Sequence, residues 1–162
     1  MRLLVGPITA VERLLSTERI DHVLTLISPD SDLPPVAVSR TVLRFNDIVE
    51  PRPGLVAPSA EVIAAILAMG ESRDATVLIH CHAGVSRSPA AAYILACALH
   101  PSGEEPALAA DLRAICPEAT PNALMIALAD EALGRGGAMI RAIAGIGRGV
   151  EAYEGTAIDW LI

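Results

Sequence analysis

Near the middle of the chain, a short run of apolar, mostly β-branched residues leads into a glycine-containing turn and then into an alanine-rich stretch. The run is Thr76–Ile79, the turn begins at Cys81, and the stretch is Ser88–Leu99, closed by Pro101. A run of this length is typical of a buried strand, and the alanine-rich stretch is typical of a helix. The sequence therefore predicts a strand–loop–helix unit, which favours folds that pack helices against a parallel sheet.

Further strand and helix patterns surround this unit on both sides. Strands are predicted over Leu3–Val5, Val23–Ile27 and Thr41–Phe45. Helices are predicted to start from a capping box at Thr9–Glu12 and to span Ala60–Met69 with Ser59 as N-cap, Glu104–Ile115, Asn122–Leu133 and Ala138–Ile143. The alternation predicts an α/β fold: a central, mostly parallel sheet of four to five strands flanked by helices. The loop after Cys81 would then join a central strand to a helix.

The length of 162 residues suits one main domain with a single core. We expect this domain to span residues 1–137. Residues 138–162 would form a C-terminal extension that is either packed on the same domain or loosely attached, and the last dozen residues have the pattern of a loosely attached end.

Charge and composition exclude several classes of partner. The net charge of −7 disfavours nucleic acid and anionic membranes, and all twelve basic residues are arginine, so no mechanism can use a lysine. No window of eighteen apolar residues suggests a membrane span, and the N-terminus has no signal-peptide pattern. Three cysteines fit neither a disulfide framework nor a zinc site. We expect a cytoplasmic protein without metal or cofactor, and the sequence sets no oligomeric state.

The turn after Cys81 concentrates the groups that bind an oxyanion. Five residues separate Cys81 from Arg87, Gly84 lies between them, and Ser88 follows at the start of the predicted helix. Inward backbone N–H groups and a helix N-terminus attract a phosphate, and a planar guanidinium bridges two of its oxygens. The same positive groups stabilise a cysteine thiolate, which is the nucleophilic form. This pattern predicts a phosphate-binding loop with a reactive cysteine at its base.

Each residue of this loop receives a predicted role. The residues expected to bind the substrate phosphate are His82, Ala83, Gly84, Val85, Ser86 and Arg87. His80 is expected to support the loop from behind. The Ser88 hydroxyl can donate to the Cys81 sulfur or cap the helix, and the two roles are compatible.

Residues His80 to Ser88 resemble the His-Cys-x5-Arg-Ser/Thr signature of the cysteine-dependent protein tyrosine phosphatases. The ending Ser86–Pro89 is most similar to the compact dual-specificity branch, and the similarity of organisation extends from about Leu3 to Leu133. The resemblance implies a metal-independent phosphatase that forms a cysteinyl-phosphate at Cys81. In that branch an aspartate about thirty residues before the cysteine protonates the leaving group.

Asp47 is the residue that best matches this acid. It precedes Cys81 by 34 residues and lies just after a predicted strand. Asp30 and Asp32 are weaker alternatives, and Asp74 lies too close to Cys81. The resemblance also implies that Asn122 supports the phosphate loop, although helix capping explains this residue equally well.

Phosphotyrosine in proteins is the expected substrate, with phosphoserine and phosphothreonine as further options. A phosphoinositide or small phosphoester phosphatase is an alternative, which the absence of lysine from the loop disfavours. A phosphate-binding module without catalysis is a third interpretation, disfavoured because Cys81, Arg87, Ser88 and an acid are all present. A rhodanese-type sulfur carrier is disfavoured, because such a protein would not require the Arg87-Ser88 ending. Low-molecular-weight phosphatases and arsenate reductases carry their loop near the N-terminus, so the position of Cys81 in the middle of the chain argues against both.

Overall fold

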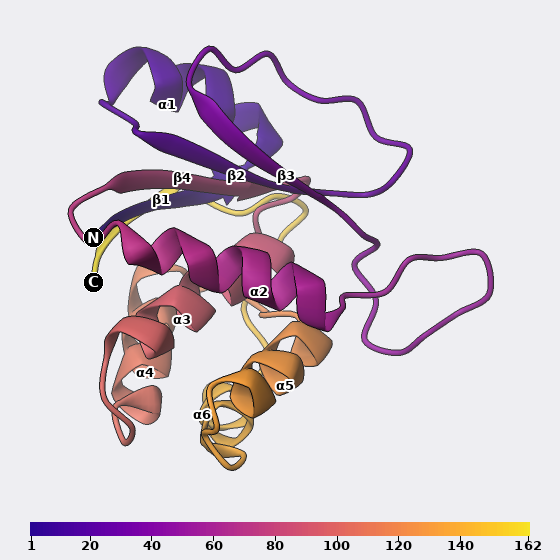
Figure 1. Cartoon of the computed structure of the whole chain (residues 1–162), viewed down its shortest axis with the longest axis vertical. Helices are drawn as coiled ribbons and strands as arrows, with labels where there is room; N and C mark the ends of the chain where they lie inside the picture. The colour runs from indigo at the N-terminus through magenta and orange to yellow at the C-terminus, as the bar shows by residue number, and fades with distance from the viewer.

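A computed structural model describes residues 1–162 and contains one five-stranded sheet with the order β3-β2-β4-β1-β5 (Figure 1). The strands are β1 (Arg2–Pro7), β2 (His22–Ile27), β3 (Ser39–Arg44), β4 (Thr76–Cys81) and β5 (Ile158–Leu161). The first four strands pair in parallel, whereas β5 runs antiparallel to β1. The predicted fold class, an α/β fold with a mostly parallel sheet, is confirmed.

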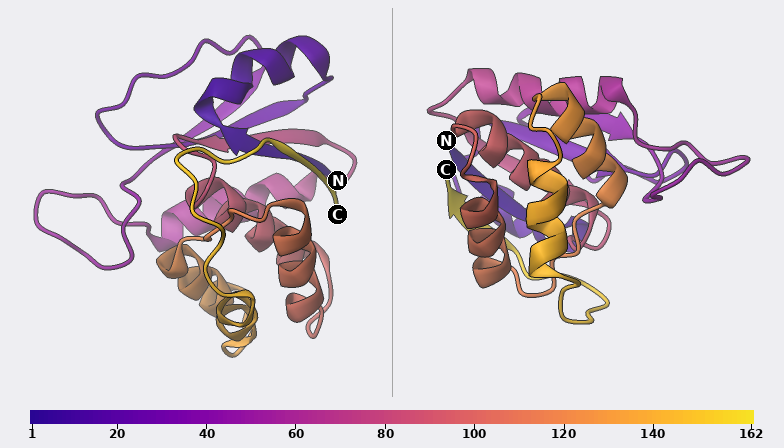
Figure 2. Two further views of the ribbon diagram at one scale, coloured as in Figure 1. Left: turned by 180° about the vertical axis from the view of Figure 1, so that it is seen from behind. Right: turned by 90° about the horizontal axis from the view of Figure 1, so that it is seen from below.

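Helices cover both faces of the sheet unequally (Figures 1 and 2). The helices are α1 (Val11–Thr17), α2 (Ala60–Ala68), α3 (Arg87–Leu99), α4 (Glu105–Ile115), α5 (Ala123–Ala132) and α6 (Ala138–Ile146), with 3₁₀ turns at Ile8–Ala10 and Met69–Glu71. Helix α1 packs on one face over a cluster of 6 buried apolar residues, and the other helices bury a cluster of 30 on the opposite side. None of the helices is long and apolar enough to cross a membrane.

Helix α3 is the central helix of the larger layer. Every residue from Arg87 to Cys97 is buried, so the helix has no exposed face over this range. A helix that is apolar all round is stable only when other elements surround it. Helices α2, α4 and α5 and strands β1 and β4 provide these contacts, which fix the N-terminus of α3 beside the end of β4.

The C-terminal end of the chain is part of the sheet, so the predicted loose attachment of the last dozen residues is wrong. In β5, Ile158 and Trp160 are buried while Asp159 and Leu161 are exposed. This two-residue alternation lets β5 cover the free edge of β1. The two termini lie side by side, since the Met1 ammonium donates to the carbonyl of Ile162 at 2.8 Å.

The predicted capping box at Thr9–Glu12 is also wrong. Helix α1 begins at Val11 after the 3₁₀ turn, and its N-cap residue makes no side-chain hydrogen bond. The Thr9 hydroxyl instead donates to the Glu154 carboxylate at 2.8 Å. A contact with a distant segment has therefore replaced the local one. The predicted cap Ser59 is confirmed, because its hydroxyl accepts from the N–H of Val62.

His80 is buried in the sheet on the strand that leads to Cys81. It pairs in register with Thr25 of β2, and its Nε2 lies 2.8 Å from the Thr25 hydroxyl. Burial lowers the pKa of His80 from 6.5 to about 4. The imidazole is therefore neutral in the folded protein near neutral pH.

This shift predicts a pH-dependent stability. Between pH 6.5 and about 4, the unfolded chain binds a proton at His80 that the folded chain does not. The free energy of unfolding is therefore expected to fall with acidification across this window, by about 3 kcal/mol in total. Urea denaturation from pH 7.5 to 4 measures it. The His80→Asn variant should lose most of this slope, and the exposed-site variant His82→Asn should keep it; equal slopes in both variants would refute the assignment.

Candidate active site

The site loop, residues 81–87, connects the carboxyl end of β4 to the N-terminus of α3. Its first residue, Cys81, is 2% exposed. The Cys81 sulfur lies 3.2 Å from the N–H of Gly84 and 3.2 Å from the hydroxyl of Ser88. Both groups can donate to a sulfur anion, and the α3 N-terminus adds a partial positive charge.

Ser88 does not cap helix α3. The helix begins at Arg87, and no side chain caps it. The Ser88 hydroxyl is fully buried, 3.2 Å from the Cys81 sulfur and 3.4 Å from the carbonyl of Gly6. Of the two roles predicted for Ser88, the geometry is compatible only with the contact to sulfur.

Four carbonyl groups of the site loop accept hydrogen bonds from backbone N–H groups outside the loop. The bonds are Ile8 N–H to His82 at 3.1 Å, Gly155 N–H to Ala83 at 2.8 Å, Thr120 N–H to Val85 at 2.8 Å and Ala90 N–H to Ser86 at 3.1 Å. In a trans peptide the N–H points opposite to the carbonyl. The N–H groups of residues 83, 84, 86 and 87 therefore face the interior of the loop, where an anion would accept from them.

Gly84 is the one position of the loop where a side chain would not fit. Its φ is +73°, a conformation that glycine adopts without a steric penalty. A Cβ at this position would also lie 2.6 Å from the nitrogen of Pro7. Both the conformation and the close approach of β1 require glycine.

Arg87 is buried beside the loop with part of its donor capacity unused. Its Nη1 donates to the carbonyl of Phe45 at 2.8 Å, and its guanidinium carbon lies 5.8 Å from the centre of the Phe45 ring. Phe45 itself is fully buried, so it belongs to the core and does not line a pocket. The Arg87 Nε has no hydrogen-bond partner. A buried N–H without a partner is costly, and a bound oxyanion would satisfy it.

Asp47 lies against the site loop although it is 34 residues away in the sequence. One carboxylate oxygen accepts from the Ser86 hydroxyl at 2.7 Å and from the side-chain amide of Asn122 at 2.8 Å. The other oxygen lies 4.0 Å from the Nε of Arg87. The Asp47 side chain is 38% exposed, so it can meet both the loop and the solvent.

Asn122 connects three parts of the site. Its side-chain amide donates to Asp47 and to the carbonyl of Ile48, and its side-chain oxygen caps α5 by accepting from the N–H of Met125 at 3.0 Å. Its backbone N–H donates to the Ser86 carbonyl at 3.4 Å. Both predicted roles of this residue, the cap and the contact with the loop, are compatible with this geometry.

The remaining candidates lie elsewhere or make no contact. Asp74 precedes β4 and is therefore at the opposite end of the strand from Cys81, and neither Asp30 nor Asp32 bonds to the site loop. The His82 side chain is exposed, while Ala83, Val85 and Ser86 are half-buried. No three His, Cys, Asp or Glu side chains lie close enough together to hold a metal ion.

The other two cysteines are unsuited to nucleophilic chemistry. Burial raises the pKa of Cys97 to about 12 and that of Cys116 to about 11. Neither forms a disulfide. Both are therefore thiols packed in the core.

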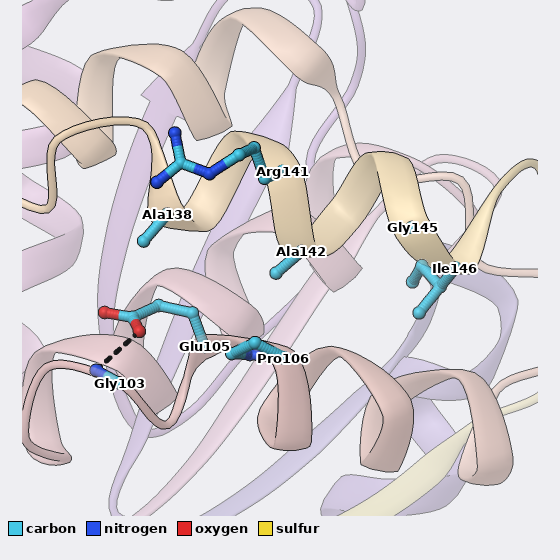
Figure 3. Close-up of a pocket in the computed structure, with 8 residues that line it drawn as sticks. All are labelled: Gly103, Glu105, Pro106, Ala138, Arg141, Ala142, Gly145 and Ile146. Carbon is cyan, nitrogen blue, oxygen red and sulfur yellow. Dashed lines mark hydrogen bonds between the residues drawn. The ribbon is translucent and has the colours of Figure 1, made fainter.

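None of the cavities of the molecule is lined by Cys81 or Arg87. One of about 410 Å³ separates the start of α4 from α6 (Figure 3). Its Glu105 carboxylate accepts from the N–H of Gly103 and pairs with Arg135 at 3.0 Å, whereas Arg141, which also lines the cavity, pairs with no carboxylate. A second hollow, of about 390 Å³, lies beside the loop between Val85 and Arg148.

Sequence reasoning missed the backbone groups that hold the loop. Ile8, Thr120 and Gly155 act through their N–H groups, which every residue except proline possesses. No side-chain pattern distinguishes these positions in the sequence. Only the topology brings them to the loop.

Comparisons with known proteins agree with this arrangement at the level of the fold. No family model matches the sequence, and no curated protein matches it. Among solved structures, that of DUSP15 has a TM-score of 0.62 at 17% identity and covers 89% of each chain. The structure of Tk-PTP in its active form has a TM-score of 0.51 at 22% identity, covering 83% of this chain and 93% of the other. The chain therefore has the fold of a compact, dual-specificity-type protein tyrosine phosphatase.

Proposed function

We propose that this chain is a metal-independent phosphatase that removes phosphate from protein phosphotyrosine, and also from phosphoserine and phosphothreonine, through a cysteinyl-phosphate. The observation that carries the proposal is the environment of the Cys81 sulfur. It lies at the base of a loop whose N–H groups face inward, 3.2 Å from both Gly84 N–H and Ser88 Oγ. This is a suitable environment for a thiolate beside a bound phosphate.

In the first step, the lone pair of the Cys81 sulfur attacks phosphorus while the bond from phosphorus to the leaving oxygen breaks. Asp47 gives a proton to that oxygen, so the product leaves as an alcohol or phenol. Arg87 holds two of the phosphate oxygens through its guanidinium, and its unpaired Nε finds an acceptor there. The inward N–H groups stabilise the charge of the transition state.

In the second step, water attacks the phosphorus of the cysteinyl-phosphate. Asp47, now a carboxylate, takes a proton from this water, and the bond between sulfur and phosphorus breaks. The departing sulfur carries a negative charge, which the Ser88 hydroxyl stabilises from 3.2 Å. Inorganic phosphate is released, and the Cys81 thiolate is regenerated.

The residues around the loop favour a singly phosphorylated substrate over a polyphosphorylated lipid. Of the loop side chains, only that of Arg87 carries a permanent positive charge, and the chain contains no lysine. The net charge of −7 would also oppose approach to an anionic membrane. A phosphoprotein substrate is therefore the better match.

Removal of the nucleophile should abolish turnover and preserve binding. For Cys81→Ser we expect a loss of kcat on the order of 10⁴ or more, because a serine hydroxyl is a far weaker nucleophile at neutral pH. Binding of tungstate, an unreactive oxyanion, should persist, since the Arg87 and backbone donors remain. Calorimetry and an aryl phosphate assay measure the two properties.

The matched control for this variant is Cys97→Ala, which removes a buried thiol outside the site. It should retain kcat even where it lowers the melting temperature. Wild-type activity in Cys81→Ser would show that the nucleophile lies elsewhere.

Loss of the acid should depend on the leaving group. For Asp47→Ala we expect kcat/KM, which reports the first step alone, to fall about 10²-fold with phenyl phosphate, whose leaving oxygen needs a proton, and much less with dinitrophenyl phosphate. A plot of log kcat/KM against leaving-group pKa should therefore be steeper for the variant than for the wild type. Asp74→Ala removes the same charge at the opposite end of β4 and should leave the plot unchanged. An equal loss for all leaving groups in Asp47→Ala would assign the acid to another residue.

A substrate panel tests the class of substrate. We expect hydrolysis of phosphotyrosine peptides in the presence of a chelator, and inhibition by vanadate. Phosphothreonine peptides and a phosphoinositide complete the panel. If kcat/KM were higher for the phosphoinositide than for the peptides, the proposed substrate class would be wrong, and the lipid would take its place.

A further inference from the structure

The C-terminal segment between α6 and β5 runs along the outside of the site loop (Figure 2). We refer to residues 149–157 as the strap. The strap is fixed by bonds from Gly149 N–H to Thr120 Oγ1 at 3.1 Å, from Val150 N–H to the Pro117 carbonyl at 2.9 Å, from Thr9 Oγ1 to Glu154 at 2.8 Å and from Thr156 N–H to Glu118. These anchors come from the α4–α5 connection and from the 3₁₀ turn after β1, so the strap has a defined position.

One strap residue contacts the peptide unit that serves the nucleophile. The Gly155 N–H donates to the Ala83 carbonyl at 2.8 Å. The other end of the same peptide unit is the Gly84 N–H, which lies 3.2 Å from the Cys81 sulfur. A hydrogen bond to a carbonyl polarises its amide and strengthens the N–H as a donor. Gly155 is therefore linked to the sulfur through a single peptide plane.

Three glycines make this close stacking of backbones possible. A Cβ on Gly155 would lie 2.9 Å from the Gly84 carbonyl oxygen, and a Cβ on Gly84 would lie 2.6 Å from the nitrogen of Pro7. A Cβ on Gly6 would lie 3.1 Å from the Cβ of Ala157. At these three glycines the end of β1, the site loop and the strap approach so closely that a side chain would displace a neighbouring atom.

We propose that the strap is a positioning element of the active site: Gly155 holds the Ala83–Gly84 peptide so that the Gly84 N–H points at the Cys81 sulfur and the bound oxyanion. This inference rests on the proposed function and goes beyond it, because it makes the C-terminal segment necessary for the nucleophile. Gly155 touches neither substrate nor sulfur, so it acts through the loop.

The test is the Gly155→Ala variant of the full chain, in which the new methyl group pushes the strap away from the Gly84 carbonyl. We expect the dissociation constant for tungstate to rise about three- to tenfold, the effect of one weakened hydrogen bond. Iodoacetamide should alkylate Cys81 more slowly at pH 6, and the pH at half-maximal alkylation should move upward. A purely structural role would change the melting temperature without moving this pH midpoint.

The matched control is Gly145→Ala in α6, where a Cβ would meet no atom within 4 Å. It should leave tungstate binding and the pH midpoint unchanged. Glu118→Ala is a second test, which removes the acceptor of the Thr156 N–H next to Gly155 without adding bulk. It should shift both readouts in the same direction as Gly155→Ala, and it decides the question if Gly155→Ala does not fold.

The outcomes separate this inference from the proposed function. If the wild type binds tungstate and hydrolyses aryl phosphates while the folded strap variants match it in both readouts, the positioning role is wrong and the phosphatase stands. If the wild type neither binds tungstate nor turns over substrate, both are wrong. Weaker binding and a higher pH midpoint in the strap variants alone support the inference.

Discussion

The N–H groups of residues 83, 84, 86 and 87 converge on one region of the site loop, an arrangement that is electrostatically unfavourable without an anion and has to be held by bonds from outside the loop. The carbonyl groups of the same peptide units hold the N–H groups in place, because the orientation of a peptide plane is fixed once its oxygen accepts a hydrogen bond. The donors are Ile8, Ala90, Thr120 and Gly155. They lie after β1, in α3, before α5 and before β5. The conformation of the loop therefore depends on the assembly of nearly the whole fold.

The packing of the core explains why these elements are rigid enough to hold the site loop in its conformation. Helix α3 is buried from Arg87 to Cys97, and β4 is buried from Val77 to Cys81. Both elements that end at the loop are thus enclosed on all sides, and rotation of either would disturb the larger apolar cluster. Strand β5 adds to this by covering the edge of β1, whose last residues press against Gly84. Packing far from the sulfur in this way fixes the donors that surround it.

The parts of the fold that the sequence predicts correctly are those with local causes. The buried run before Cys81, the alanine-rich helix after it and the cap at Ser59 are all set by neighbouring residues. The errors have non-local causes. Thr9 bonds to Glu154, 145 residues away. The short segment Ile158–Leu161 becomes a strand only because it pairs with the free edge of β1. In the site, the sequence predicts Cys81, Arg87 and Asp47, because their side chains are chemically distinctive. It cannot predict the backbone donors, because almost every residue has an N–H group.

The contacts of Asp47 bear on how one carboxyl group could serve both proposed steps. The Ser86 hydroxyl and the Asn122 amide both donate to one of its oxygens, which holds that oxygen against the site loop. The first step requires the protonated form. The other oxygen has no donor within hydrogen-bond distance and lies 4.0 Å from Arg87 Nε, so it is the atom available to carry a proton. One oxygen of Asp47 therefore holds the carboxyl group in place against the loop, and the other is free to give a proton to the leaving oxygen in the first step and to take one from water in the second.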